Sequence, residues 1–293
     1  MIVATGGNGQ LGRLVAARLE RELDPSAFRL SVRAVAPDDP RRARGVAMRE
    51  ADYDDPAALA RAFEGAEQLV LVSADGLDEV RLRRQLNAVR AAKDAGVAHI
   101  VFTSSSTVGK GPGLAHAEVN RRTEDAIVET GAAYTILRNN LYAELLLMFA
   151  GPALATGVIR LPAGQGRAAM IARADIAEAV VRVVSGTVPR GRIYELTGPA
   201  AFGYHDLAAT VSATAGRAIT YEPSSTDAAI AWLAGRLPVP EFYLPLIVDA
   251  AREFGEGWLE PVTADFRVLV GTDARSAPDV WRSVMREAGR GGG

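Results

Sequence analysis

The chain has 293 residues, a net charge of −2 and no cysteine, and 48% of its residues are hydrophobic. The charge balance argues against nucleic acid as the main partner, and the lack of cysteine excludes disulfides, thiolate metal sites and cysteine catalysis. No basic leader or apolar run of membrane-spanning length occurs, so we expect a cytoplasmic protein without a membrane partner.

Apolar runs of strand length alternate with segments of helical periodicity through the first part of the chain. The predicted strands are Ile2–Ala4, Phe28–Ala36, Met48–Ala51, Gln68–Val72, His99–Thr103 and Tyr134–Arg138. The predicted helices between them are Gln10–Leu23, Pro56–Phe63, Glu79–Ala95 and Glu118–Glu129. This order predicts an α/β fold with a doubly wound, Rossmann-like parallel sheet that carries helices on both faces.

The pattern is less regular after residue 138. The segments with helical periodicity are Leu141–Ala150, Ile176–Ser185, Leu207–Ala215, Thr226–Leu237 and Leu244–Phe254. The extended segments are Val158–Leu161, Arg192–Leu196 and Ile219–Tyr221. We therefore expect a dinucleotide-binding core in residues 1–150. Residues 151–293 would supply the remaining core elements and a small C-terminal α+β cap that binds the substrate.

The most informative segment joins the first strand to the first helix. It consists of Thr5, Gly6, Gly7, Asn8, Gly9, Gln10, Leu11 and Gly12. Glycines at this spacing allow a tight turn, close approach of the backbone to a pyrophosphate, and close packing of helix on strand. The helix start also offers unpaired N–H groups and a partial positive charge to phosphates. A purely structural turn is the alternative, and we interpret the segment as a dinucleotide-binding loop.

Several short motifs follow this loop in a characteristic order. They are Ala51-Asp52-Tyr53, Thr103-Ser104-Ser105, Tyr134 to Asn139, Arg173 to Ala177, and Tyr194 to Gly198. In their order and spacing they resemble the NmrA-like family of atypical short-chain dehydrogenases/reductases, and within it the type-2 NAD(P)H:quinone oxidoreductases. The resemblance covers nearly the whole chain and is strongest up to about residue 200. It implies a nicotinamide dinucleotide as cofactor.

The resemblance implies roles for residues at the ends of the third and fourth strands. Asp52 would accept a hydrogen bond from the adenine amino group, although a turn or helix-cap role before Asp54 is an equal alternative. Ser73 and Ala74 end the fourth strand, where the backbone would lie against the adenine ribose.

Other residues are expected near the nicotinamide. Thr103, Ser104 and Ser105 end the fifth strand, where a hydroxyl would hold a substrate carbonyl or the nicotinamide amide; the alternative is a hydroxyl that satisfies its own turn. Asn139 leaves the sixth strand in a loop that folds over the nicotinamide ring in similar proteins. Tyr142 is either a wall of the substrate pocket or an ordinary core residue.

The chain departs from the short-chain dehydrogenase pattern after the strand-five serines. No Tyr-x-x-x-Lys pair follows them, so the usual proton donor is missing. Asn120 stands where similar quinone reductases often carry a basic or histidine side chain, and its amide can hydrogen-bond but cannot transfer a proton. His116 can titrate, although a lone histidine here is more often a surface residue. The three histidines show no metal-ligand spacing, so we expect no metal.

The residues after the second strand leave the cofactor choice open. Asp38 would favour NAD(H) through the ribose 2′-hydroxyl, whereas Arg41 and Arg42 can reach the 2′-phosphate of NADP(H). The alternative is that these residues form a solvated charged turn without a role in cofactor binding. The resemblance tips our expectation slightly toward NADP(H).

Three functions fit these observations. The leading hypothesis is an NAD(P)H-dependent oxidoreductase that transfers hydride to a quinone or a similar small conjugated carbonyl compound. A quinone yields a stabilised hydroquinone anion, so solvent can supply the proton, and Ser104, Asn120 and Asn139 are the expected catalytic residues. The alternatives are a non-catalytic dinucleotide sensor of the NmrA type and a tailoring reductase of secondary metabolism. A homodimer is an open alternative to a monomer.

Overall fold

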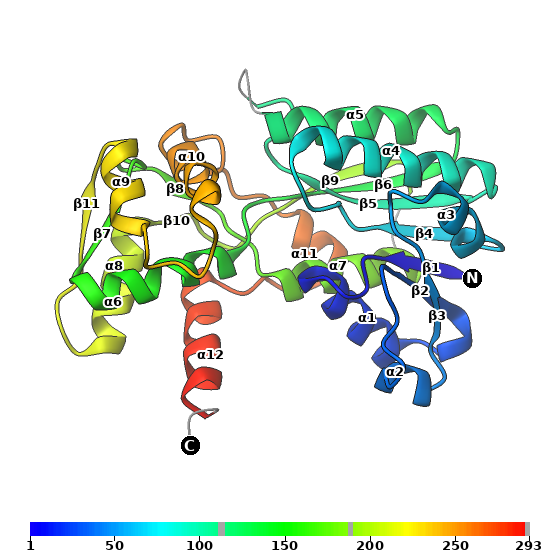
Figure 1. Ribbon diagram of the computed structural model, residues 1–293, viewed down its shortest axis with the longest axis horizontal. Coiled ribbons are helices and arrows are strands. Elements are labelled where there is room, and N and C mark those ends of the chain that lie inside the picture. The colour runs from blue at the N-terminus through cyan, green and yellow to red at the C-terminus, as the bar shows by residue number, and fades with distance from the viewer. Residues whose placement is uncertain (111–114, 187–189, 291–293) are drawn as a thin grey trace. The chain divides into compact units, whose positions relative to one another are not determined.

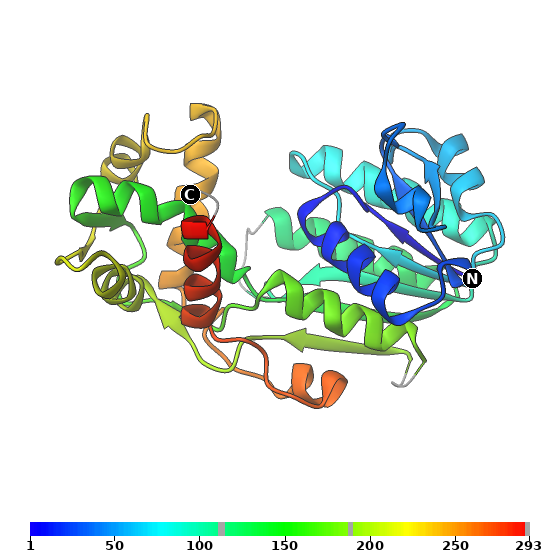
Figure 2. The same cartoon turned by 90° about the horizontal axis from the view of Figure 1, so that it is seen from below.

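The computed structural model describes residues 1–110, 115–186 and 190–290, without the side chains of residues 115, 116 and 286–290. The chain forms two units (Figures 1 and 2). The first contains Met1–Asn139, Arg173–Leu196 and Asp265–Thr272, and the second contains Asn140–Ala172, Thr197–Ala264 and Asp273–Gly293. The chain leaves the first unit after Asn139 and returns to it twice, so residues 151–293 contribute segments to both units.

The first unit is built on a parallel sheet. Its strands are β1 (Ile2–Thr5), β2 (Phe28–Val32), β3 (Ala47–Glu50), β4 (Gln68–Leu71), β5 (His99–Ser105), β6 (Ala133–Asn139) and β9 (Arg192–Leu196). The strand order is β3-β2-β1-β4-β5-β6-β9, and every pairing between neighbours is parallel. The doubly wound, Rossmann-like sheet predicted from the sequence is therefore confirmed.

Helices cover both faces of this sheet (Figures 1 and 2). On one face, α3 (Pro56–Phe63), α4 (Asp78–Asp94) and α5 (Ala115–Glu129) pack side by side. On the other face, α1 (Gln10–Glu22) packs on α7 (Arg173–Val184), and α7 also contacts α11 (Asp265–Val270). The strand order reverses direction between β1 and β4, which places a topological switch point beside the glycine loop.

The central strands are continuous apolar runs because both of their faces are covered. Val3, Leu69, Ile100 and Phe102 are fully buried there. His99 is also buried, and its ring contacts the side chains of Gln68 and Thr135 at 3.0 and 2.9 Å. Burial lowers the pKa of His99 to about 4, so this histidine is a neutral structural residue near pH 7.

The second unit has little sheet and many short helices. Its strands form two small sheets, β7 (Val158–Leu161) with β11 (Thr220–Pro223) and β8 (Arg167–Ala168) with β10 (Phe202–Gly203). Its helices are η2 (Ala143–Phe149), α6 (Ala150–Thr156), α8 (Tyr204–Ala215), α9 (Thr226–Leu233), η3 (Glu241–Tyr243), α10 (Leu244–Gly255) and α12 (Ala277–Arg290). Among the described helices of the whole chain, none is long and apolar enough to cross a bilayer.

Some elements differ from the sequence prediction. Strand β2 ends at Val32 rather than Ala36, because its partner β3 ends at Glu50 and the Glu50 carboxylate then accepts from the Val35 N–H at 2.8 Å. The helix predicted at Leu141–Ala150 is a 3-10 helix followed by a short α-helix. Seven short or terminal elements were not predicted: η1 (Pro25–Ala27), α2 (Pro40–Ala43), β8, β10, η3, α11 and α12.

The packing of α1 generates a first test. A Cβ atom at Gly12 would overlap the carbonyl group of Gly6, so Gly12→Ala should force the helix off the loop. We expect the free energy of unfolding in urea to fall by about 1–3 kcal/mol. Gly151→Ala is the matched control, because a Cβ there meets nothing within 4 Å and alanine favours the helix. Equal stability of the two variants would contradict this account of the loop.

Candidate functional site

The glycine loop presents the start of α1 as an open helix terminus. Gly6 has a φ of +67°, and its carbonyl accepts from the Gly9 N–H at 2.8 Å. Gly9 is the N-cap, no side chain caps the helix, and its first turn holds no acidic residue. Gly9 and Gln10 are exposed. The first N–H groups of α1 therefore point out of the protein with a partial positive charge, as an anion site requires.

The side chains that flank this loop hold the scaffold together. The Thr5 hydroxyl donates to the Val70 carbonyl at 3.1 Å and accepts from the Val72 N–H at 3.0 Å. It also lies 2.7 Å from the buried hydroxyl of Tyr53. Leu11 is buried in the core. Thr5 and Leu11 thus shape the loop, and only their backbone is available to a ligand.

Arg41 is fixed against the glycine loop. Its guanidinium donates to the Gly7 carbonyl at 2.9 Å and to the Asn8 side-chain oxygen at 2.7 Å. It also donates twice to the Asp39 carboxylate, at 2.9 and 2.6 Å. The hydrogen bond from Arg41 lowers the pKa of Asp39 to about 2. Since a guanidinium has five N–H donors, four are used here and one stays open.

Arg41 lines an open groove of about 740 Å³ beside this loop. The charged residues along it are Arg13, Glu20, Asp39, Arg41 and Arg44. Arg44 pairs with Glu20 at 2.7 Å, and Asp39 pairs with Arg41. Arg13 adds an exposed cation from the first turn of α1. The groove therefore has a positive balance suited to a phosphate that lies outside the sheet edge.

Residues predicted to contact adenosine have structural partners. The Asp52 carboxylate accepts from the Asp54 N–H at 2.9 Å and lies 3.5 Å from Arg33, so it forms the turn that was the alternative interpretation. The Ser73 N–H donates to the Thr103 hydroxyl at 3.0 Å. The Ala74 N–H donates to the Gln85 side chain at 3.1 Å. Contact of Asp52, Ser73 and Ala74 with a cofactor stays a prediction.

The Ser104 hydroxyl belongs to a buried ionic network. It donates to the Glu124 carboxylate at 2.5 Å, and Arg138 donates to the same carboxylate at 3.1 and 2.7 Å. Ser104 and Glu124 are each only 6% exposed. The hydrogen bond to Glu124 raises the pKa of Arg138. Ser104 is therefore oriented toward α5, and its predicted catalytic role would need this bond to open.

Polar side-chain atoms without partners occur at the end of β6, directly after β5 and in α5. Ser105 pairs with Asn139 in the sheet register, and the Ser106 N–H donates to the Asn139 carbonyl at 2.9 Å. Both side-chain polar atoms of Asn139 are buried and have no hydrogen-bond partner among the described residues. The same holds for the Ser106 hydroxyl and the Asn120 side-chain oxygen. Buried polar groups are rarely left unpaired, so these atoms mark a place for a polar ligand.

The remaining predicted residues have other contacts or lie outside the described side chains. The Ser105 hydroxyl contacts that of Thr107 at 2.8 Å. Tyr142 belongs to the second unit, where it pairs with Ile171 in an isolated bridge. The side chain of His116 lies outside the described residues. No cluster of potential metal ligands occurs among the residues that the structure describes.

Sequence reasoning missed three residues of this region: Arg13, Asp39 and Ser106. Asp39-Pro40 is a signal that could have been read, because Asp at the N-cap with Pro at the first helical position starts a helix. That short helix α2 holds Arg41 in place. Ser106 directly follows the predicted Thr103-Ser104-Ser105 motif and carries no separate signal.

A nicotinamide dinucleotide fits this set of residues. The open α1 terminus and the glycine loop suit a pyrophosphate, the groove at Arg41 suits a ribose phosphate, and the unpaired amide of Asn139 suits a carboxamide. Together with the strand order, these features define a dinucleotide-binding protein of the Rossmann type.

Comparison with known proteins gives the family. The chain belongs to the NAD(P)H-binding family, whose model matches residues 6–186. Quinone oxidoreductase 2 of Escherichia coli is 38% identical over 271 residues, which cover 92% of this chain and 94% of that protein. An NmrA-like family domain-containing oxidoreductase of Aspergillus flavus is 28% identical over 230 residues, or 76% and 74% of the two chains.

A solved structure agrees with these matches. The NADPH-dependent quinone oxidoreductase of Escherichia coli, crystallised with NADPH, superposes with a TM-score of 0.90 and 32% identity. The match covers 97% of this chain and all of that one. The resemblance to NmrA-like quinone oxidoreductases, stated above from short motifs, is confirmed.

Proposed function

We propose that this protein is an NAD(P)H-dependent oxidoreductase that reduces a quinone or a similar small conjugated carbonyl compound. The observation that carries the proposal is the likeness to a quinone oxidoreductase along nearly the full length of both chains. The intact glycine loop and open α1 terminus support it independently, because they are what a dinucleotide-dependent enzyme requires.

The residues of the first unit suggest how the cofactor is held. The N–H groups of Gln10 and Leu11 would bind the pyrophosphate, and the open N–H of Arg41, together with Arg13, would bind the 2′-phosphate of NADPH. Asn8 would act indirectly, since its side chain joins Arg41 to the Ala34 carbonyl, at 2.7 Å from each. NADP(H) is therefore favoured over NAD(H).

When bound, the reduced cofactor supplies a hydride. Asn139 would hold the nicotinamide carboxamide, because a free amide offers both the donor and the acceptor that another amide needs. The Ser106 hydroxyl would donate to a carbonyl oxygen of the substrate, and the Asn120 side-chain oxygen would accept from a ribose hydroxyl of the cofactor. None of the three residues can give up a proton near pH 7. Quinones suit such a site, since their reduced anion is stabilised and takes its proton from solvent.

The direct experiment is a dinucleotide oxidation assay at 340 nm with the purified protein. We expect 1,4-naphthoquinone to drive the oxidation of NADPH, and cyclohexanone to give no turnover because an alkoxide needs an acid. Tight NADPH binding without turnover on a panel of quinones would instead favour the sensor hypothesis. Turnover of cyclohexanone would contradict the argument from the missing acid.

Removal of the Arg41 side chain should weaken the binding of NADPH more than the binding of NADH. Arg41→Ala loses a charge-assisted hydrogen bond and leaves Asp39 facing the phosphate, so the Kd for NADPH should rise about 10- to 100-fold. The Kd for NADH should change little, as measured by calorimetry. Arg42→Ala serves as control, because Arg42 is exposed and, against the expectation from the sequence, is not among the residues that line the groove. An equal loss for both dinucleotides would show that Arg41 only shapes the loop.

The adjacent residues Asn139 and Asn140 allow a second test with a matched control. Asn139→Ala removes an amide with no internal partner, so kcat/KM with naphthoquinone should fall at least about tenfold while stability in urea stays the same or rises. Asn140→Ala removes a hydrogen bond of 2.9 Å to the Leu259 carbonyl and should lower stability by about 1 kcal/mol. Unchanged kinetics of the Asn139 variant would rule out its contact with the cofactor.

Expectations about the partner, the substrate-binding residues and the location of the protein complete the proposal. The partner is a small-molecule substrate rather than nucleic acid or a membrane. Substrate binding by residues 151–293 and contact of the substrate with Ser105 or Tyr142 stay predictions from the sequence. A cytoplasmic location and a homodimer stay predictions from the sequence.

A further inference from the structure

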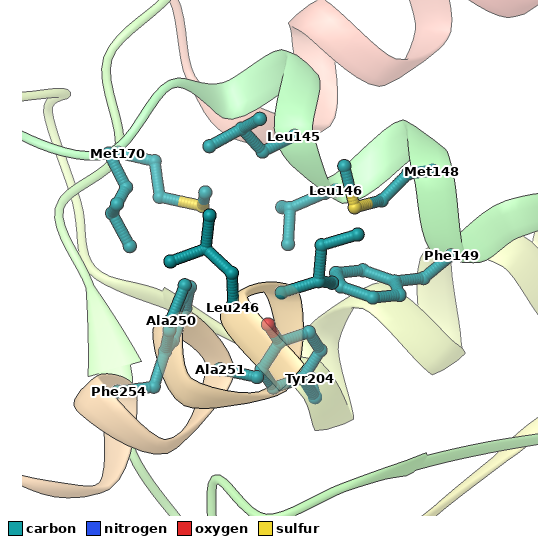
Figure 3. A pocket seen from close by; sticks show the side chains of 12 residues that line it. Leu145, Leu146, Met148, Phe149, Met170, Tyr204, Leu246, Ala250, Ala251 and Phe254 are labelled. Carbon is teal, nitrogen blue, oxygen red and sulfur yellow. The ribbon is translucent and has the colours of Figure 1, made fainter. Parts of the chain in front are cut away.

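The second unit contains an apolar cavity of about 150 Å³. Its walls come from η2, α10, and the residues Leu141, Met170 and Tyr204 (Figure 3). The side chains that line it are Leu141, Leu145, Leu146, Met148, Phe149, Met170, Tyr204, Leu246, Ile247, Ala250, Ala251 and Phe254. No charged residue is among them, so an ion entering this cavity would lose its hydration without compensation.

Tyr204 supplies the polar atom of this lining. Its side chain is 3% exposed, and its ring is held by Phe149, Phe254 and Tyr221 at centroid distances of 5.6, 4.9 and 5.6 Å. Figure 3 shows its oxygen directed among the lining side chains, toward Leu246. No described residue forms a hydrogen bond with this hydroxyl, and, unlike the enclosed amide of Asn139, the Tyr204 oxygen keeps some surface open to the cavity. Burial raises the pKa of Tyr204, so the hydroxyl stays protonated and can donate.

The volume of the cavity limits the size of the ligand that it can hold. An apolar cavity of about 150 Å³ lined by aliphatic and aromatic residues holds a molecule the size of benzene. Met148 and Met170 are flexible and polarisable, which lets the cavity adapt to a substituent on the ring. Of the lining residues, Leu246 is 60% exposed, so this wall of the cavity adjoins the surface of the unit.

We propose that this cavity binds a neutral molecule of about one six-membered ring whose carbonyl oxygen accepts a hydrogen bond from Tyr204. The ring would contact the leucine, methionine and phenylalanine side chains. The carbonyl would accept from the Tyr204 hydroxyl in place of solvent, since no described residue accepts from it. This site needs no dinucleotide, so it stands or falls independently of the proposed reductase activity.

The test compares two probes of the same shape in the absence of dinucleotide. Acetophenone carries the carbonyl and ethylbenzene lacks it, and calorimetry gives the Kd of each for the full chain. Tyr204→Phe should weaken acetophenone binding about five- to tenfold and leave ethylbenzene unchanged. Its thermal midpoint should be unchanged or higher, because the variant removes an unpaired buried hydroxyl.

Two further variants complete the design. Ala250→Leu fills the cavity and should abolish binding of both probes. Tyr243→Phe removes a hydroxyl outside the cavity and should change neither Kd. The proposal is overturned if the wild type binds neither probe, if Tyr204→Phe binds acetophenone as tightly as the wild type, or if Ala250→Leu retains binding. A lower thermal midpoint of Tyr204→Phe would also overturn it, because the hydroxyl would then have an internal partner.

Discussion

The contact between helix α1 and the carbonyl group of Gly6 leaves room for nothing larger than hydrogen at Gly12. This contact fixes where the helix begins, because the same carbonyl accepts from Gly9, the N-cap. The exposed amides of the first turn are a direct result. The rest of the candidate site is arranged around this terminus: the sheet edge on one side, and the Arg41 clamp on the other.

Charge near the loop is arranged before any ligand arrives. Asp39 and Asn8 orient the Arg41 guanidinium, so the side chain loses little further freedom when it meets a phosphate. The same clamp partly neutralises the arginine, which leaves discrimination between the dinucleotides to one open N–H and to Arg13. Near the ends of β5 and β6 the unpartnered polar groups are instead uncharged amides and hydroxyls. Such groups can orient a ligand but cannot protonate it.

The fold and the position of the glycine loop could be predicted from the sequence, because both depend on short-range patterns of residue types. Buried parallel strands are apolar runs, and the helix α3 starts and ends where Pro56 and Phe63 predicted. The direction in which each side chain points could not be predicted from short-range patterns. Thr103 and Ser104 are neighbours in β5, yet one bonds to the backbone of Ser73 and the other to Glu124 of α5. Such partners are distant in sequence, and only the packing of helices on the sheet reveals them.

The connectivity of the two units has a consequence for how this protein can be divided. The chain passes from one unit to the other five times, and the first unit receives α7, β9 and α11 only after the first departure at Asn139. Strand β9 closes one edge of the sheet by pairing with β6, and α7 covers α1. A fragment cut at residue 150 would therefore expose a strand edge and an apolar helix face. A single cut or joining point in the chain cannot exchange one whole unit for that of a relative, because neither unit is a continuous segment.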